Sequence, residues 1–196
     1  MRSGSFTTVS DGIQEIEAAD RATFRKWLEE NHTTETAVWL IFWKKGSGRA
    51  SIDWQDAVDE ALCFGWIDSK AQSLDQNRYR QYWSVRKPGS TWSRINKDKV
   101  AELTAAGLMA PAGLAAVERA KEDGSWTILD GPEAGIVPDD LASAMDKAGV
   151  RSDFDQLAPG ARKAILAWLV MAKRQATRAG RVHKTVEALQ RGESPT

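Results

Sequence analysis

Apolar side chains recur every three or four residues in several stretches of the chain, and this spacing predicts helices. Phe24 and Leu28 share one face of a first predicted helix, which Asp20 caps. Asp53 caps a second helix, and Gly65 ends it because glycine accommodates a left-handed backbone. Further helices are predicted to begin near Ser93, Pro111, Pro138, Pro159 and Thr177.

Short apolar and aromatic runs predict strands among these helices. Val38–Trp43 is β-branched and aromatic, which is typical of a buried strand. Another strand is predicted to open at Trp66, and a turn at Asp75–Asn77 joins it to a returning strand over Tyr79–Val85. Because helices and strands are mixed without a regular βαβ repeat, the sequence predicts an α+β fold.

The turn and linker signals divide the chain into three predicted parts. Residues 1–18 lack periodicity and are rich in small polar residues, so we expect a flexible N-terminal arm. Residues 19–128 are predicted to form a small mixed helix/strand domain, and residues 136–192 an all-helical C-terminal extension packed on it. Residues 130–135 contain a Gly-Pro pair and are predicted to be a linker.

The composition is that of an ordinary globular chain. Its formal net charge is zero at pH 7, so bulk electrostatics give no case for nucleic acid or an anionic membrane as partner. The single cysteine, Cys63, cannot form an internal disulfide, which fits a reducing compartment. No signal peptide is visible and every apolar stretch is short, so we expect a cytoplasmic protein without a membrane span.

No constellation for catalysis stands out. The only histidines, His32 and His183, lie far apart and without neighbouring ligands, so we expect neither a metal nor a cofactor. Cys63 precedes the end of a predicted helix, where the helix dipole does not lower the pKa of a thiol. We therefore expect a non-enzyme. The alternative is an enzyme with an unrecognised site around Cys63, Asp68 and Arg86.

Residues 83–97 show the clearest signs of a binding site. This segment leaves a strand, turns, and enters a helix, and Arg86 offers a planar fork that matches a carboxylate or a phosphate. The alternative is a capped turn whose tryptophans fill the core and whose Arg86 pairs with Asp68. We predict a site for a small polar or anionic ligand, formed by Trp66, Asp68, Arg86, Ser90, Trp92, Ser93 and Asn96.

The C-terminal stretch is basic within a neutral chain. Residues 162–191 are rich in Lys and Arg and contain one acid, Glu187. The alternative is a solvated helix face that acidic helices elsewhere neutralise. Aromatic residues are sparse here, which argues against stacking with single-stranded nucleic acid. A patch for a protein partner is predicted from Arg174, Arg178, Arg181 and Lys184.

Four segments together resemble a known family over roughly residues 20–192. They are Ala61–Asp68, Lys87–Lys97, Gly107–Leu114 and Ala172–Arg178. On these segments the chain resembles the YdeI/OmpD-associated (OmdA, bacteriocin-protection) family. Val85 is a departure, because the family usually carries proline there, and proline would fix the backbone and remove a hydrogen-bond donor.

The resemblance implies a phenotype and not a reaction. Members of this family are named for protection against bacteriocins or cationic antimicrobial peptides, and for association with an outer-membrane porin system. We therefore expect a non-enzymatic binding or stress-tolerance protein. Its partner would be either the small ligand of residues 83–97 or a protein that docks on the basic C-terminal helices.

Overall fold

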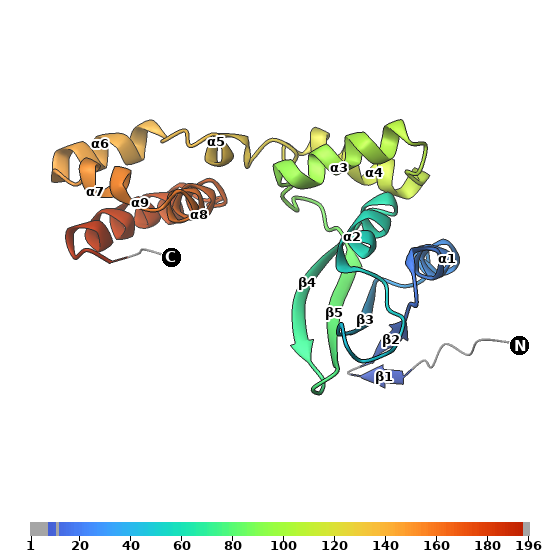
Figure 1. Ribbon diagram of the computed structural model, residues 1–196. Coiled ribbons are helices and arrows are strands. Elements are labelled where there is room, and N and C mark those ends of the chain that lie inside the picture. Colours follow the sequence, from blue (N-terminus) through green and yellow to red (C-terminus); the bar gives the residue numbers. More distant parts are fainter. Residues whose placement is uncertain (1–7, 11, 194–196) are drawn as a thin grey trace, which may run out of the picture. The chain divides into compact units, whose positions relative to one another are not determined.

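The computed structural model describes residues 8–10 and 12–193, and its helices and strands form two units (Figure 1). The fold is α+β, as predicted, because one unit combines a sheet with helices while the described residues of the other form helices and loops. The N-terminal unit comprises Met1–Ser90 and Ile95–Asp123, and the C-terminal unit comprises Thr91–Arg94 and Gly124–Thr196.

A five-stranded sheet organises the N-terminal unit. β2 and β3 run parallel, and the other neighbouring strands run antiparallel. Ala37 pairs with Ser84 and Trp43 with Arg78, so β3 and β5 pair along the whole of β3, which is buried on both faces. In spatial order the strands are β1 (Thr8–Ser10), β2 (Ile13–Glu17), β3 (Ala37–Trp43), β5 (Arg78–Val85) and β4 (Trp66–Ser73).

The predicted arm over residues 1–18 is wrong for the residues that β1 and β2 occupy. Residues 1–7 and 11 lie outside the described residues. Ile16 is buried, and Glu15 is only 9% exposed, with its carboxylate accepting a hydrogen bond from Arg80 of β5 that offsets the cost of burial. A charged residue at a buried strand position hides the alternation by which a strand is recognised, so only the tertiary ion pair reveals this strand.

Aromatic rings attach the helix over Arg21–Asn31 to one face of the sheet. Phe24 lies against Trp83 and Trp27 lies edge-on to Trp66, with ring centroids 5.8 Å apart in both pairs. These contacts bury large apolar surfaces, which is the main source of stability for such a face. The helices of this unit are α1 (Arg21–Asn31), α2 (Trp54–Cys63), α3 (Arg94–Ala105) and α4 (Pro111–Glu122).

Two glycines let α4 approach the end of α2. Gly65 ends α2 with φ 73°, as predicted, and a Cβ added there would stand 2.9 Å from that of Ala116. A Cβ added at Gly113 would stand 2.2 Å from the carbonyl oxygen of Cys63. The N–H of Ala110 donates to the same oxygen at 3.0 Å. The backbones therefore touch directly, which a side chain at either glycine would prevent.

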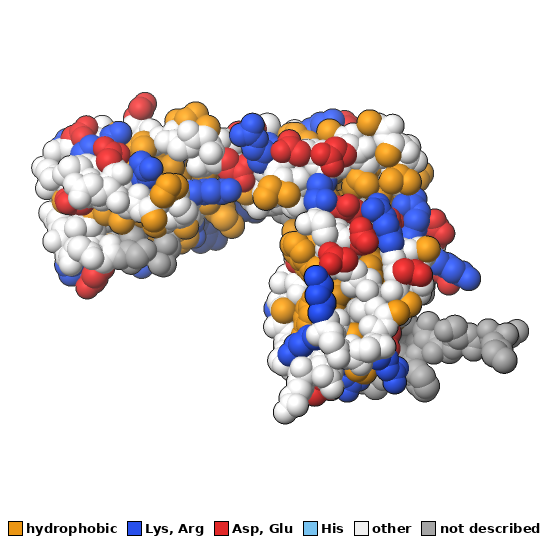
Figure 2. Space-filling view, viewed as in Figure 1, with side chains coloured by type: hydrophobic (Ala, Val, Ile, Leu, Met, Phe, Trp, Pro, Cys, Tyr) orange, Lys and Arg blue, Asp and Glu red, His pale blue; other side chains and the backbone are white. Residues whose placement is uncertain are grey.

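A cluster of ion pairs joins α1 to α2. Glu60 is 1% exposed and accepts hydrogen bonds from Nε of Arg21 at 2.5 Å and Nη1 of Arg25 at 2.8 Å. Burial lowers the pKa of both guanidinium groups, but Glu60 and further neighbouring groups together outweigh it, so both pKa values lie above the ordinary one. Figure 2 shows basic and acidic side chains gathered side by side over these helices.

The C-terminal unit is built on one apolar core. Leu141, Met145, Phe154, Ile165 and Leu169 are at most 1% exposed and belong to it. The predicted linker at residues 130–135 contains a short helix instead, and a helix of six residues follows the helix over Asp139–Ala148. Both are too short to produce a recognisable helical period in the sequence. The helices are α5 (Asp130–Glu133), α6 (Asp139–Ala148), α7 (Arg151–Gln156), α8 (Pro159–Val170) and α9 (Gln175–Gln190).

Candidate functional sites

The structure brings together four of the seven residues predicted to bind a ligand. Trp66, Asp68, Arg86 and Asn96 line a cavity of about 10 Å³ in the N-terminal unit. This volume is about what one water molecule occupies, and a metabolite needs several hundred cubic ångströms. As it stands, the cavity can hold water, and a larger ligand would have to displace buried side chains.

Arg86 is the buried charge of this cluster. Arg86 is 3% exposed, and its backbone N–H donates to the carbonyl of Gly65 at 2.9 Å. Burial lowers the pKa of its guanidinium to about 10, while the charge of Asp68 acts in the opposite direction. Asp68 also accepts a hydrogen bond from Nε2 of Gln81 at 3.0 Å. A charge held at such a desolvation cost is typical of a buried ion pair.

The other three predicted residues, Ser90, Trp92 and Ser93, are not among those that line this cavity. Trp92 and Ser93 belong to the C-terminal unit, where Trp92 is 1% exposed and tilts against Trp126 with centroids 5.1 Å apart. The N–H of Ser90 donates to the carbonyl of Lys87 at 3.0 Å, which closes the turn. The indole of Trp92 therefore packs in a core and offers no free stacking face. A small ligand at residues 83–97 stays a prediction.

The environment of Cys63 does not favour a reactive thiolate. Its side chain is fully buried, and burial, with the charge of Glu60, raises the pKa of the thiol against the opposing effect of Arg25. Nδ1 of His32 lies 2.8 Å from the carbonyl oxygen of Leu28, which engages that ring nitrogen with the backbone. The thiol is therefore protonated at neutral pH, whereas a nucleophilic cysteine needs an accessible thiolate.

We expect Cys63 to resist a disulfide reagent such as Ellman's reagent in the folded protein. At mildly alkaline pH the reaction should be on the order of 100-fold slower than in denaturant, because it requires opening of the core. In the folded state the pKa of the Cys63 thiol lies above its usual value of 9.0. The stability that the protonated thiol contributes should therefore be lost as the pH rises past 9.0. Thiol absorbance assays and alkaline denaturation of Cys63→Ala measure both effects. A fast reaction in the native state would contradict the expectation.

The C-terminal unit contains a groove of about 590 Å³ between α6 and α9. Hydrophobic side chains reach the surface of this unit among charged ones (Figure 2). The floor of the groove consists of small apolar side chains, namely Ala144, Ala148, Ala179, Val182 and Val186. Asp140, Lys147, Gln175, Arg178 and His183 form its polar rim. The sequence reasoning missed this groove, although the spacing of these residues on two helices could have indicated it.

The only acid of the rim is neutralised. Nε and Nη2 of Arg178 donate to the two carboxylate oxygens of Asp140 at 2.6 and 2.9 Å. This hydrogen bonding lowers the pKa of Asp140 below its usual value. Lys147 is exposed and takes part in no ion pair among the described residues. The rim therefore presents a net positive charge to a partner.

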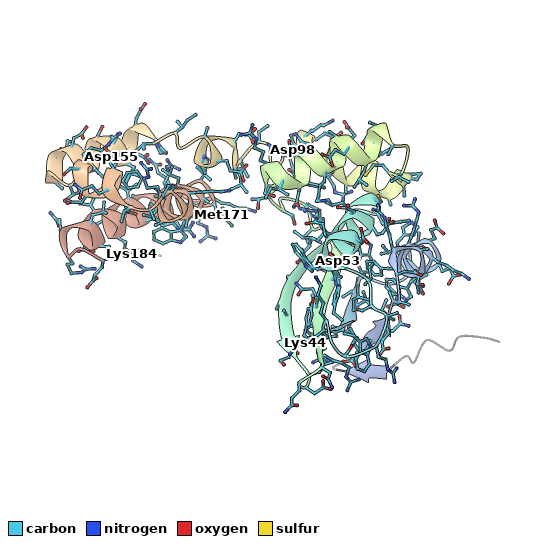
Figure 3. The ribbon with its side chains drawn as sticks, viewed as in Figure 1. Lys44, Asp53, Asp98, Asp155, Met171 and Lys184 are labelled. Atoms are coloured by element: carbon cyan, nitrogen blue, oxygen red, sulfur yellow. The ribbon has the colours of Figure 1, made fainter. Side chains whose placement is uncertain are left out.

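The four cations of the predicted interaction patch have different surroundings. Arg178 is held by Asp140, and Arg181 donates to the carbonyl of Trp168 with its guanidinium 4.9 Å from the indole centroid. Arg174 and Lys184 are exposed, and neither joins an ion pair in the part of the chain that the structure describes. Figure 3 labels Lys184 on α9. These two cations are therefore available to a partner of α9, while Arg178 and Arg181 serve the unit itself.

Among residues 8–10 and 12–193, no cluster of three or more His, Cys, Asp or Glu side chains is placed to hold a metal ion. No helix in these ranges is long and apolar enough to cross a membrane.

Two family models match the chain, and neither the curated proteins nor the solved structures yield a match. The model described as "Domain of unknown function (DUF8412)" matches residues 16–116, and the one described as "Bacteriocin-protection, YdeI or OmpD-Associated" matches residues 134–192. The second match confirms the predicted resemblance, on the range that includes Ala172–Arg178. The chain thus belongs to the DUF8412 family, and residues 134–192 of its C-terminal unit are similar to the bacteriocin-protection, YdeI or OmpD-associated family.

Proposed function

We propose that the protein is a non-enzymatic binding protein whose α6/α9 groove receives one amphipathic helix of a partner polypeptide. The observation that carries this proposal is the apolar floor of the groove, within the residues that match the bacteriocin-protection model. A groove of this kind is a common recognition mode for a helix with apolar residues on one face. The family description agrees with it, because bacteriocins are polypeptides and association also requires a partner.

The dimensions of the groove favour a short helical segment. α6 has ten residues and is therefore about 15 Å long at 1.5 Å per residue, so a partner would contact about three of its turns. Three of the five floor residues are alanines. Small side chains allow a third helix to approach closely, and the valines give it apolar surface to bury.

The charges of the rim favour acidic residues beside the apolar face of the partner. Asp140 is neutralised by Arg178, whereas Lys147 stands exposed at the rim and Lys184 is exposed on the same helix as the groove floor. Electrostatic complementarity of this kind selects partners and accelerates association. A strongly cationic helix would meet like charge, so an acidic amphipathic helix is the better fit.

A small ligand beside Arg86 is the second hypothesis. It is supported by the buried guanidinium and by the carboxylate of Asp68, but the cavity of about 10 Å³ leaves no room for it without rearrangement. The groove needs no such rearrangement and is therefore the first site to test. A cytoplasmic location, predicted from the sequence, is compatible with either hypothesis and stays a prediction.

The test measures binding of a labelled helical peptide of about 16 residues, long enough to form a helix, by fluorescence anisotropy. The peptide carries leucines on one face and glutamates on the other, and its twin carries lysines in place of the glutamates. We expect the acidic peptide to bind, with an affinity that falls as salt is added. Ala179→Glu should weaken binding at least about tenfold, because it brings a carboxylate into the apolar contact.

Ala176→Glu is the matched control, since Ala176 is exposed on the same helix three residues earlier and does not line the groove. This variant should bind as the wild type does. Equal binding by both variants would exclude the groove. Preference for the lysine peptide would leave the groove in place but reverse the charge assigned to the partner.

A further inference from the structure

The C-terminal unit has a second concave surface, and it differs in chemistry from the α6/α9 groove. A cleft of about 610 Å³ lies among α5, α7 and α8, a volume in the range of small-molecule sites. Its accessible apolar lining includes Ala134, Val137 and Pro159, whereas Pro132, Phe154 and Leu166 are buried. Its polar wall contains three cations, Arg151, Arg162 and Lys163, and two acids, Glu133 and Asp155.

The two acids of the cleft are already engaged. Oε1 of Glu133 lies 3.0 Å from Nζ of Lys163, and its Oε2 accepts the backbone N–H of Arg94 at 2.9 Å. The side chain of Glu133 is only 9% exposed, so neither oxygen is left for a ligand. Asp155, which lies on α7 (Figure 3), pairs with Nε of Arg151 at 3.4 Å. Two of the three cations are thereby compensated.

Arg162 is the cation that remains. It is half-buried, lines the cleft, and forms no ion pair within the described ranges of the chain. It stands in the first turn of α8, where the field of the helix disfavours a positive charge, and where no acidic residue is present. A half-buried guanidinium with apolar side chains beside it is suited to a planar anion that also has an apolar body.

We propose that this cleft binds a small monocarboxylate with an apolar body. The carboxylate would accept two hydrogen bonds from the guanidinium of Arg162, and the body would pack on the accessible side chains of Val137 and Pro159. The net charge of the cleft determines the class of ligand that we propose. One cation is uncompensated, and a carboxylate brings one negative charge, whereas a phosphate monoester brings about 1.5 to 2 at neutral pH.

The test is isothermal titration calorimetry of the full chain with 2-naphthoate, its neutral amide and 2-naphthyl phosphate. We expect 2-naphthoate to bind the wild type, and Arg162→Gln to weaken this binding about tenfold or more, as loss of a hydrogen bond to a charged group does. The amide should bind the wild type at least about tenfold more weakly than the acid, for the same reason. Arg162→Lys should restore part of the affinity, because it restores the charge without the fork.

Arg174→Gln is the matched control, since Arg174 is an exposed arginine of the same unit outside the cleft. It should leave the affinity for 2-naphthoate unchanged, and so should Ala179→Glu, which alters the α6/α9 groove. The proposal is overturned if 2-naphthoate does not bind, if Arg162→Gln binds it as well as the wild type, or if the amide binds equally well. Tighter binding of the phosphate would overturn the monocarboxylate class. None of these outcomes depends on whether the α6/α9 groove binds a peptide.

Discussion

Replacing Gly113 with alanine is expected to lower the free energy of unfolding by about 3 kcal/mol, the upper part of the range for overpacking a core. Gly113 lies inside α4, where alanine favours the helix by about 1 kcal/mol over glycine. The new Cβ would stand 2.2 Å from the carbonyl oxygen of Cys63, a backbone atom that no side-chain rotation can move. The steric cost therefore exceeds the gain in helix propensity. Denaturation in urea measures the change.

Gly180→Ala is the matched control for this prediction. Gly180 also lies inside a helix, α9, but a Cβ added there meets nothing within 4 Å. This variant should gain about 0.5 to 1 kcal/mol from helix propensity alone. The two substitutions are chemically identical and should change stability in opposite directions. A stability of Gly113→Ala equal to the wild type would show that α4 can move away from α2 at little cost.

Glu60→Gln is expected to cost about 2 to 3 kcal/mol of unfolding free energy, below the full cost of breaking a buried ion pair. The carboxylate is 2% exposed and serves two guanidinium groups, and glutamine keeps the shape of the side chain while removing its charge. Arg21 and Arg25 are 36% and 27% exposed, so water would recover part of the lost interaction. This partial recovery is why we expect less than the full cost. Thermal and urea denaturation measure the difference.

Glu29→Gln tests whether burial, and not the ion pair as such, is decisive. Glu29 pairs with Nε of Arg25 at 3.2 Å, and its side chain is 54% exposed. An exposed pair of this kind contributes at most about 0.5 kcal/mol, so the variant should be nearly as stable as the wild type. If both glutamine variants lost the same stability, the environment of Glu60 would have no special role.

Much of the helical architecture could be predicted because its signals are local. Asp20 caps α1 by accepting the N–H of Thr23 at 2.8 Å, and Asp53 caps α2 by accepting that of Gln55 at 2.9 Å. Pro159 stands in the first turn of α8, as predicted. Caps and proline positions act within one turn of helix, so the residues that decide them are neighbours in the chain.

The predicted ligand site shows what neighbouring residues in the sequence could not predict, namely the burial of each side chain. Arg86 and Trp92 lie six residues apart, and both carry chemistry suited to a ligand, but the structure assigns them to different units. Arg86 lines a small cavity with Trp66 and Asp68, while Trp92 packs beside Trp126. Proximity along the chain predicted one site, but it carries no information on burial, and Trp92 is 1% exposed beside a second indole ring.

The sequence by itself determined the α+β class, the caps of α1 and α2, and the resemblance of the C-terminal residues to the bacteriocin-protection family. These depend on spacing and on residues close together in the chain. Only the tertiary structure decided that β2 joins the sheet, that Gly113 must lack a side chain, and that Arg162 keeps an uncompensated charge in a cleft. The first two depend on a partner far away in the sequence, namely Arg80 for Glu15 and Cys63 for Gly113, and the third depends on which distant residues surround Arg162. Such contacts leave no period or motif in the sequence itself.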